Sequence, residues 1–100
     1  MLTSDRIIKL INENNQKIKK FGVKRIGLFG SYVTNNQKSE SDIDVLVEFE
    51  KGKKTFDNYM ELKFYLENLF DCNVDLVVRE ALKLELKRNI LKSVKYATGL

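Results

Sequence analysis

Histidine is absent from this 100-residue sequence, and cysteine occurs once. Without histidine the chain cannot build a Ser-His-Asp triad or a zinc site that contains histidine. Cys72 cannot form an internal disulfide, and we expect it to be a small, partly buried side chain. Any metal ion must therefore be held mainly by carboxylates, which favours magnesium or manganese.

Long hydrophobic runs are also missing. No apolar stretch approaches the roughly 20 residues that span a bilayer, and the first ten residues lack the basic and then apolar pattern of a signal peptide. We therefore expect a cytoplasmic protein with no membrane association. The hydrophobic fraction of 43% and the charged fraction of 32% are typical of a globular domain. The length favours a single domain over residues 1–100.

The net charge of +4 is unevenly distributed. Residues 1–25 contain seven Lys or Arg and two acids, and residues 79–100 contain six and two. Ten of the fourteen acids lie between residues 40 and 75. Basic flanks could attract a polyanion that the acidic centre binds through metal ions, although each lysine taken singly is better explained as a solvated helix residue. Mild basicity alone does not favour direct nucleic-acid binding.

Hydrophobic periodicity predicts alternating helices and strands. Thr3 or Ser4 can cap the first helix, and Gly22 suits the left-handed position that ends it. The segment from Ala81 to Leu91 is ambiguous, because its leucines alternate, but Leu, Lys, Glu and Ala favour helix. The predicted helices are 3–20, 55–70 and 81–91, and the predicted strands are 23–29, 42–49, 73–78 and 94–97. The order α-β-β-α-β-α-β indicates an α/β or α+β fold, with helices packed on a small mixed sheet.

Two acids stand inside one of the predicted strands. Asp42 and Asp44 are two residues apart in DIDVLVEF, so their side chains point to the same face. At roughly 3.3 Å per residue their Cα atoms lie about 6.6 Å apart, and the carboxylates can converge on a metal ion. Two ionised acids so close together repel each other unless a cation compensates them. For this pair alone, acids at a strand edge facing water are the simpler explanation.

Asp75 changes that balance. It stands in the apolar strand VDLVV, and it can share the face of Asp42 and Asp44 if the two strands are neighbours. Three carboxylates on one face would form a ligand set for two magnesium ions. Gly30 and Ser31 follow an earlier strand, where exposed backbone N–H groups and the serine hydroxyl suit a phosphate. A Gly-Ser pair alone is also typical of an ordinary turn.

The combination of Gly-Ser, ten residues, Asp-x-Asp and a later strand Asp resembles the signature of the DNA polymerase beta-like nucleotidyltransferase superfamily. The sequence is most similar to its smallest members, the minimal nucleotidyltransferases (MNT domains), through IGLFGSY, SESDIDVLVEFEKG, MELKFYLENLF, VDLVV and ILKSVKYA. The resemblance covers most of the chain and implies the nucleotidyltransferase fold. It implies that Gly30 and Ser31 hold the phosphates of ATP, and that Asp42 and Asp44 bind two magnesium ions, or manganese in their place. Asp75 would bind the catalytic metal and help to activate the acceptor hydroxyl.

One departure from the family pattern concerns the stretch after Gly-Ser-Tyr. Relatives usually carry an arginine and a glycine there, but residues 33–37 read VTNNQ. An arginine would neutralise phosphate charge through a bidentate contact, whereas Lys38 offers only a point charge. The departure predicts weaker nucleotide binding or a lost activity.

Family members of this size typically pair with a HEPN-domain toxin. The resemblance therefore implies an antitoxin and protein adenylyltransferase that moves AMP from ATP to a tyrosine of the toxin, which allows a hetero-oligomer with it. Two alternatives stay open: an antitoxin with a decayed site that masks its partner, and a nucleotidyltransferase for a small hydroxylated molecule. The intact acids favour the enzyme and the missing arginine favours masking. The lack of a separate substrate domain ranks the third hypothesis last.

Overall fold

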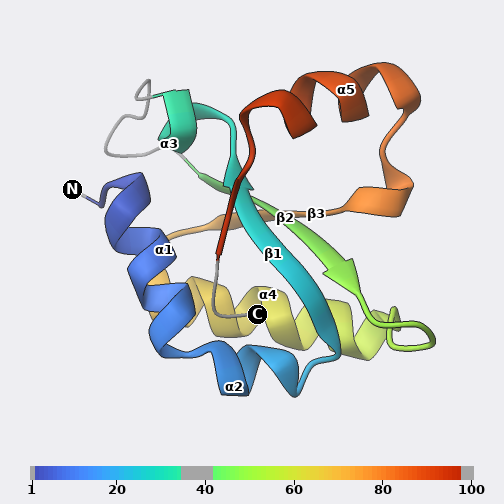
Figure 1. The fold of residues 1–100 in the computed structure, drawn as a ribbon. Coiled ribbons are helices and arrows are strands. Elements are labelled where there is room, and N and C mark those ends of the chain that lie inside the picture. Colours follow the sequence, from blue (N-terminus) through green and yellow to red (C-terminus); the bar gives the residue numbers. More distant parts are fainter. Residues whose placement is uncertain (1, 35–41, 98–100) are drawn as a thin grey trace.

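The computed structural model describes residues 2–34 and 42–97 of the chain, which form a sheet covered by helices (Figure 1). The helices are α1 (Ser4–Glu13), α2 (Asn15–Lys19), α3 (Ser31–Thr34), α4 (Phe56–Phe70), the 3₁₀ turn η1 (Arg79–Ala81) and α5 (Leu84–Ser93). The strands are β1 (Val23–Phe29), β2 (Ile43–Phe49), β3 (Val74–Val78) and β4 (Lys95–Tyr96). This order confirms the predicted α-β-β-α-β-α-β mixed fold.

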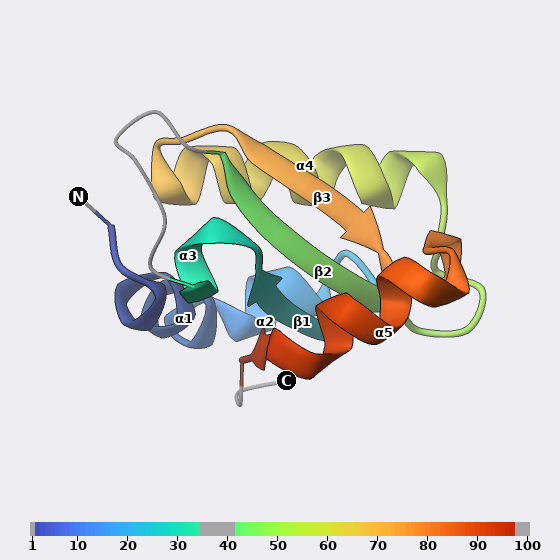
Figure 2. The same cartoon turned by 90° about the horizontal axis from the view of Figure 1, so that it is seen from above.

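The four strands form one mixed sheet in the order β3-β2-β1-β4. β1 pairs with β2 and with β4 in antiparallel fashion, whereas β2 and β3 are parallel. A parallel pair needs a crossover connection, and α4 supplies it. Figure 2 shows β3 alongside β2, with α4 alongside β3. β2, which contains Asp44 and directly follows Asp42, is therefore the direct neighbour of the strand that carries Asp75.

The first predicted helix is two helices. Thr3 caps α1 by accepting a hydrogen bond from the Arg6 N–H, as expected. The helix then ends at Asn14, whose φ of −114° and ψ of 20° are not helical. The Asn14 side chain donates to the carbonyl of Leu10, so it competes for the backbone bonds that would continue the helix. A continuous helix over residues 3–20 was thus wrong, and α2 follows as a separate short helix.

The C-terminal helix begins later than predicted. β3 leads directly into η1, where the Leu82 N–H donates to the carbonyl of Arg79. Lys83 is still extended, with φ of −66° and ψ of 149°, and α5 starts only at Leu84. The expected start at Ala81 was wrong because a 3₁₀ turn takes up the residues that a local propensity argument assigns to the helix. The helical reading of the alternating leucines was right.

The hydrophobic core lies on one face of the sheet. Fully buried side chains from the helices pack there against fully buried side chains from the strands. The helical residues are Ile7, Ile11, Ile18, Leu62 and Leu66, and the strand residues are Ile26, Leu28, Ile43, Val45 and Val47. Figure 1 shows α1, α2 and α4 on this side and α5 on the other. We call the face away from the core the second face of the sheet. None of the described helices is long and apolar enough to cross a membrane.

Candidate functional site

The second face of the sheet carries two of the predicted site acids, Asp44 and Asp75. In β2 the residues Ile43, Val45 and Val47 belong to the core cluster, so strand alternation turns Asp44, Leu46 and Glu48 the other way. Leu46 is 0% exposed although it is not part of that core cluster. The second face is thus partly covered, and Asp44 lies at one end of its polar row and Glu48 at the other. They are four positions apart, or roughly 13 Å along the strand.

Asp44 lies against Gly30 at the end of β1. The register pairs Phe29 with Asp44 across the antiparallel ladder, which places the next residue, Gly30, beside the carboxylate. A Cβ atom built on Gly30 would come within 2.2 Å of Asp44 Oδ2, and Gly30 has a left-handed φ of +74°. Only glycine combines that backbone angle with so close an approach. The predicted Gly-Ser and Asp-x-Asp motifs therefore meet at this point.

Asp75 is the register partner of Asp44 in the parallel pair of β2 and β3. Asp75 is exposed, Asp44 is partly buried, and Asp42 is exposed just before β2 begins. The three predicted acids thus lie at the same end of the sheet, where β2 and β3 begin. Over residues 2–34 and 42–97, no three carboxylate or thiol groups are already gathered as ligands of one ion. The metal site stays a prediction that rests on the kind and placement of these oxygen donors.

The predicted phosphate loop lies where β1 turns into α3. The Val33 N–H donates to the Gly30 carbonyl at 3.1 Å, so the chain turns immediately after Gly30. Ser31 is the first residue of the four-residue α3, while its side chain lies outside what the structure describes. Residues 35–38, which decide whether a cation replaces the missing family arginine, also lie outside the described part.

A charge cluster around the buried Glu48, on the second face, was missed by sequence reasoning. Glu48 is only 8% exposed, and its Oε2 and Oε1 atoms lie 3.6 Å from Arg25 Nη1 and 3.8 Å from Arg79 Nη1. The Arg25 guanidinium also stacks on the Tyr96 ring, 3.9 Å from its centre. The available signal was the alternation of β2, which puts Glu48 on the face of Asp44. Its arginine partners come from distant segments and could not be read locally.

Two tyrosines have raised pKa values. Burial raises the pKa of the Tyr32 hydroxyl, and the nearby Cys72 thiol adds a smaller electrostatic contribution. Burial also raises the pKa of Tyr65, whose hydroxyl donates to Asn14 Oδ1 at 3.0 Å. Tyr32 is 2% exposed and belongs to the core cluster. These side chains support the fold next to the site and are not candidates for its chemistry.

Residues 7–97 match the family model of the nucleotidyltransferase domain. The protein adenylyltransferase MntA of Thermococcus cleftensis is 38% identical over 97 residues, which cover 96% of this chain and 97% of that protein. The matched residues include Gly30, Asp42, Asp44 and Asp75. The matched range therefore includes Gly30 and all three predicted acids.

Solved structures give the same answer for the fold. One that is provisionally described as a minimal nucleotidyltransferase superposes with a TM-score of 0.81 at 26% identity, covering 94% of this chain and 95% of that one. A structure described as a toxin-antitoxin with AMP-PNP superposes with a TM-score of 0.70 at 29% identity, covering 99% of this chain and 75% of that one.

Proposed function

Because the chain belongs to the nucleotidyltransferase domain family, we propose that it is an antitoxin that transfers AMP from ATP to a tyrosine hydroxyl of a HEPN-domain toxin. One observation carries the proposal: Asp44 lies between Gly30, which directly follows β1, and Asp75 on β3. The names of its relatives support it, since one is a protein adenylyltransferase and another is a toxin-antitoxin with an ATP analogue.

The transfer requires a bond to form and a bond to break at the α-phosphorus of ATP. The tyrosine oxygen bonds to that phosphorus, the bond to the pyrophosphate oxygen breaks, and pyrophosphate leaves. The phenolic proton passes to Asp75, which is exposed and on the correct face. Gly30 and Ser31 position the phosphates, because the turn between β1 and α3 begins at Gly30, directly beside Asp44. A phenol, with a pKa of about 10, loses its proton more easily than an aliphatic alcohol.

Asp42, Asp44 and Asp75 are the residues that would hold two magnesium or manganese ions. Their carboxylate oxygens are the ligands that these hard cations prefer. Asp42 and Asp75 are exposed, so their side chains can change rotamer around the fixed Asp44. When bound, the ions supply compensation for charge on the phosphates and the leaving pyrophosphate.

A second candidate, the antitoxin that only masks its toxin, is favoured by one observation. Residues 33–37 lack the arginine that relatives use at the phosphates, and a lysine is not its equivalent. The two candidates differ in whether the toxin gains AMP. They agree that the chain contacts the toxin, so affinity alone does not separate them.

The test is to incubate the chain with the HEPN-domain toxin of its own genome, Mg²⁺ and ATP, and to weigh the toxin by intact mass spectrometry. We expect the mass of AMP to be added, and we expect Asp44→Asn to slow its addition by about 100-fold or more, as when a group that stabilises transition-state charge is removed. Chelation of divalent cations should abolish the addition.

Asp71→Asn is the matched control for this experiment. Asp71 is exposed and lies outside the site, and asparagine tolerates its left-handed φ of 53°. The control should transfer AMP at the rate of the original chain. If no AMP is added while Asp44→Asn still silences the toxin, the masking antitoxin is the correct function.

A further inference from the structure

We propose that α5 is the surface on which the acceptor protein docks, and that the acceptor carries an acidic and partly apolar patch beside its target tyrosine. The inference rests on the proposed function, because it names where the toxin binds. The central residues are Leu84, Arg88 and Lys92, which recur every four positions and so form one stripe along the helix. We call this stripe the α5 surface.

The first observation is that α5 has no buried side chains that would fix it on the sheet. None of its ten residues is buried, although the helix is amphipathic and contains four large apolar residues, Leu84, Leu86, Ile90 and Leu91. Leu84 is 67% exposed and Leu86 is 53% exposed. Helices of globular proteins owe most of their stability to a packed apolar face. A helix with such residues left open is therefore suited to pack on another protein.

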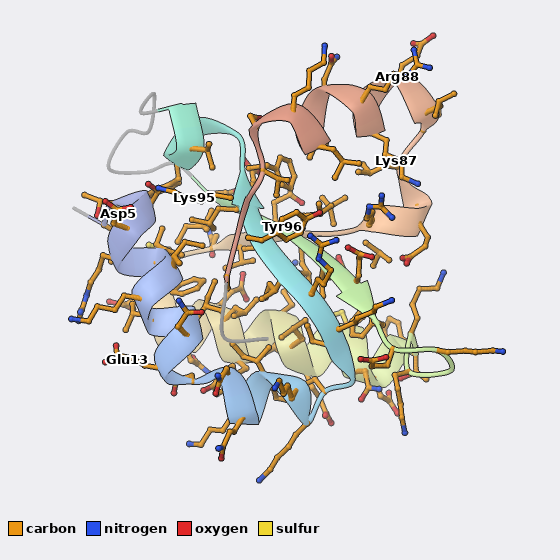
Figure 3. All side chains as sticks on the ribbon, viewed as in Figure 1. Asp5, Glu13, Lys87, Arg88, Lys95 and Tyr96 are labelled. Atoms are coloured by element: carbon orange, nitrogen blue, oxygen red, sulfur yellow. The ribbon has the colours of Figure 1, made fainter. Side chains whose placement is uncertain are left out.

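The second observation is charge. α5 and the residue before it contain Lys83, Lys87, Arg88 and Lys92, against the single acid Glu85. Figure 3 shows Arg88 projecting outward from α5, whereas Lys87 points toward the sheet side of the helix. Outward cations attract a partner of opposite charge and fix its orientation more than they add affinity. The occupant that fits is a protein surface with exposed carboxylates around an apolar spot.

The third observation is how the helix is anchored. Arg79, just before α5, and Tyr96, just after it, both converge on the cluster around Glu48 and Arg25. This cluster lies on the second face, which also carries Asp44. Polar contacts at both ends therefore fix α5 on the side of the sheet where transfer occurs. Arg79 is only four residues from Asp75, or roughly 13 Å in an extended strand, so a protein bound to α5 can reach the acids.

Protein is favoured over RNA as the occupant. Sequence-independent binding of a nucleic acid depends on a basic face that neutralises many phosphates. The outward stripe offers two cations, with a leucine that is two-thirds exposed beside them. Arginine next to exposed apolar side chains is typical of protein interfaces. Direct RNA binding by this helix is therefore one of the outcomes that the test must distinguish.

The test uses two variants of the α5 surface, Arg88→Glu with Lys92→Glu and, separately, Leu84→Ser. The matched control is Lys19→Glu with Lys20→Glu, which makes the same charge change at exposed positions of α2 and just after it, on the core side of the sheet. Affinity for the purified, nuclease-treated toxin is measured by calorimetry at two salt concentrations, and circular dichroism checks that each variant is folded.

We expect the charge variant to bind the toxin at least 10-fold more weakly, and to lose the salt dependence that the original chain shows. Leu84→Ser should weaken binding without changing the salt dependence, and the α2 control should bind normally. AMP transfer by the α5 variants should recover at saturating toxin, because the acids are untouched. Unchanged affinity in both α5 variants, or binding that disappears after nuclease treatment, would overturn the proposal.

Failure of the proposed function gives a different pattern. If the original chain binds the toxin through α5 but adds no AMP, the docking proposal is supported and the proposed AMP transfer is wrong. If AMP is added and Asp44→Asn abolishes it while the α5 variants bind normally, the transfer stands and the docking surface is wrong.

Discussion

Gly30 decides the position of the Asp44 carboxylate. Its left-handed φ of +74° and the 2.2 Å approach of a hypothetical Cβ to Asp44 Oδ2 leave room for no other residue without a shift. Gly52 has a similar φ of +81°, but nothing lies within 4 Å of its added Cβ. The two glycines share the backbone requirement, and only Gly30 has the steric one. Gly30 is therefore constrained by its neighbour Asp44, whereas Gly52 is constrained only by its backbone angle.

We predict that Gly30→Ala lowers the free energy of unfolding by about 1–3 kcal/mol, the range for a residue forced into an unfavourable backbone region. It should also lower AMP transfer more than the stability loss explains, because Asp44 must move. Urea unfolding and the mass assay measure the two effects. Gly52→Ala should cost at most a similar amount of stability and transfer AMP normally. Equal activity of the two variants would contradict the role given to Gly30.

The Glu48 carboxylate is also constrained by its neighbours, in this case by their charge. One carboxylate, 8% exposed, is placed between two guanidinium groups at 3.6 and 3.8 Å. Burying a charge is costly unless a partner compensates it, and removing one partner of a buried pair leaves the other uncompensated. The cluster is therefore better understood as fixing the ends of α5 than as a source of net stability.

At the scale of elements, α4 protects the free edge of the sheet. β3 is an edge strand, and unpaired edges invite association with other chains. Tyr59 of α4 donates from its hydroxyl to the Leu76 carbonyl at 2.6 Å, and Glu67 accepts from the Val74 N–H at 3.0 Å. One helix thus supplies the crossover, part of the core and two hydrogen bonds to the edge of the strand that carries Asp75.

We predict that Glu67→Ala speeds hydrogen exchange of the Val74 amide, because this N–H donates to the Glu67 carboxylate at 3.0 Å. The free energy of unfolding should fall by about 0.5–1.5 kcal/mol, the usual net value of one hydrogen bond. NMR-detected exchange and urea unfolding provide the measurements. Glu61→Ala, at an exposed position of the same helix, should change neither. An unchanged exchange rate at Val74 would show that this bond does not protect the edge.

At the scale of the whole molecule, the two faces of the sheet have different tasks. The core face holds the buried residues of α1, α2 and α4, and the second face holds the acids, the charge cluster and α5. The buried core and the predicted site acids are therefore largely made of different side chains on opposite faces. Tyr32 is an exception to this separation. It directly follows the predicted site residue Ser31, yet its side chain is buried in the core.

We predict that alkaline pH lowers the free energy of unfolding through the buried Tyr32 and the partly buried Tyr65. The pKa values of Tyr32 and Tyr65 are raised by burial in the folded state, so the unfolded chain releases these protons near pH 10 while the folded chain keeps them. Above pH 10 the unfolded state binds fewer protons, and the free energy of unfolding must fall as the pH rises. Below pH 10 both states are protonated, and this contribution is fully present.

The measurement is urea unfolding from pH 8 to pH 11. We expect the original chain to lose stability above pH 10, and Tyr32→Phe to lose less over the same interval because one of the two groups is gone. Tyr96→Phe leaves Tyr32 and Tyr65 in place and should follow the original chain. Parallel pH profiles for the original chain and Tyr32→Phe would contradict this assignment.

The sequence by itself determined the features that depend on neighbours along the chain. Strand alternation placed Asp44 on the face opposite Ile43 and Val45, and the bounds of β1 followed from a short apolar run after Gly22. These are consequences of backbone geometry over a few residues. The predicted helix from Thr55 was off by one residue, since Thr55 is the N-cap and α4 begins at Phe56. The break at Asn14 and the late start of α5 were missed because side-chain and 3₁₀ hydrogen bonds overrode local propensity.

Only the tertiary structure decided which distant residues meet. The pairing of Asp44 with Asp75 depends on the parallel register of β2 and β3, and a slip of one residue would turn one acid to the opposite face. The contact of Gly30 with Asp44 depends in the same way on the antiparallel register of β1 and β2. Arg25, Glu48, Arg79 and Tyr96 come from four separate segments. Their meeting could not be read from spacing, because long-range pairing is fixed by the packing of the whole sheet and not by any single stretch of sequence.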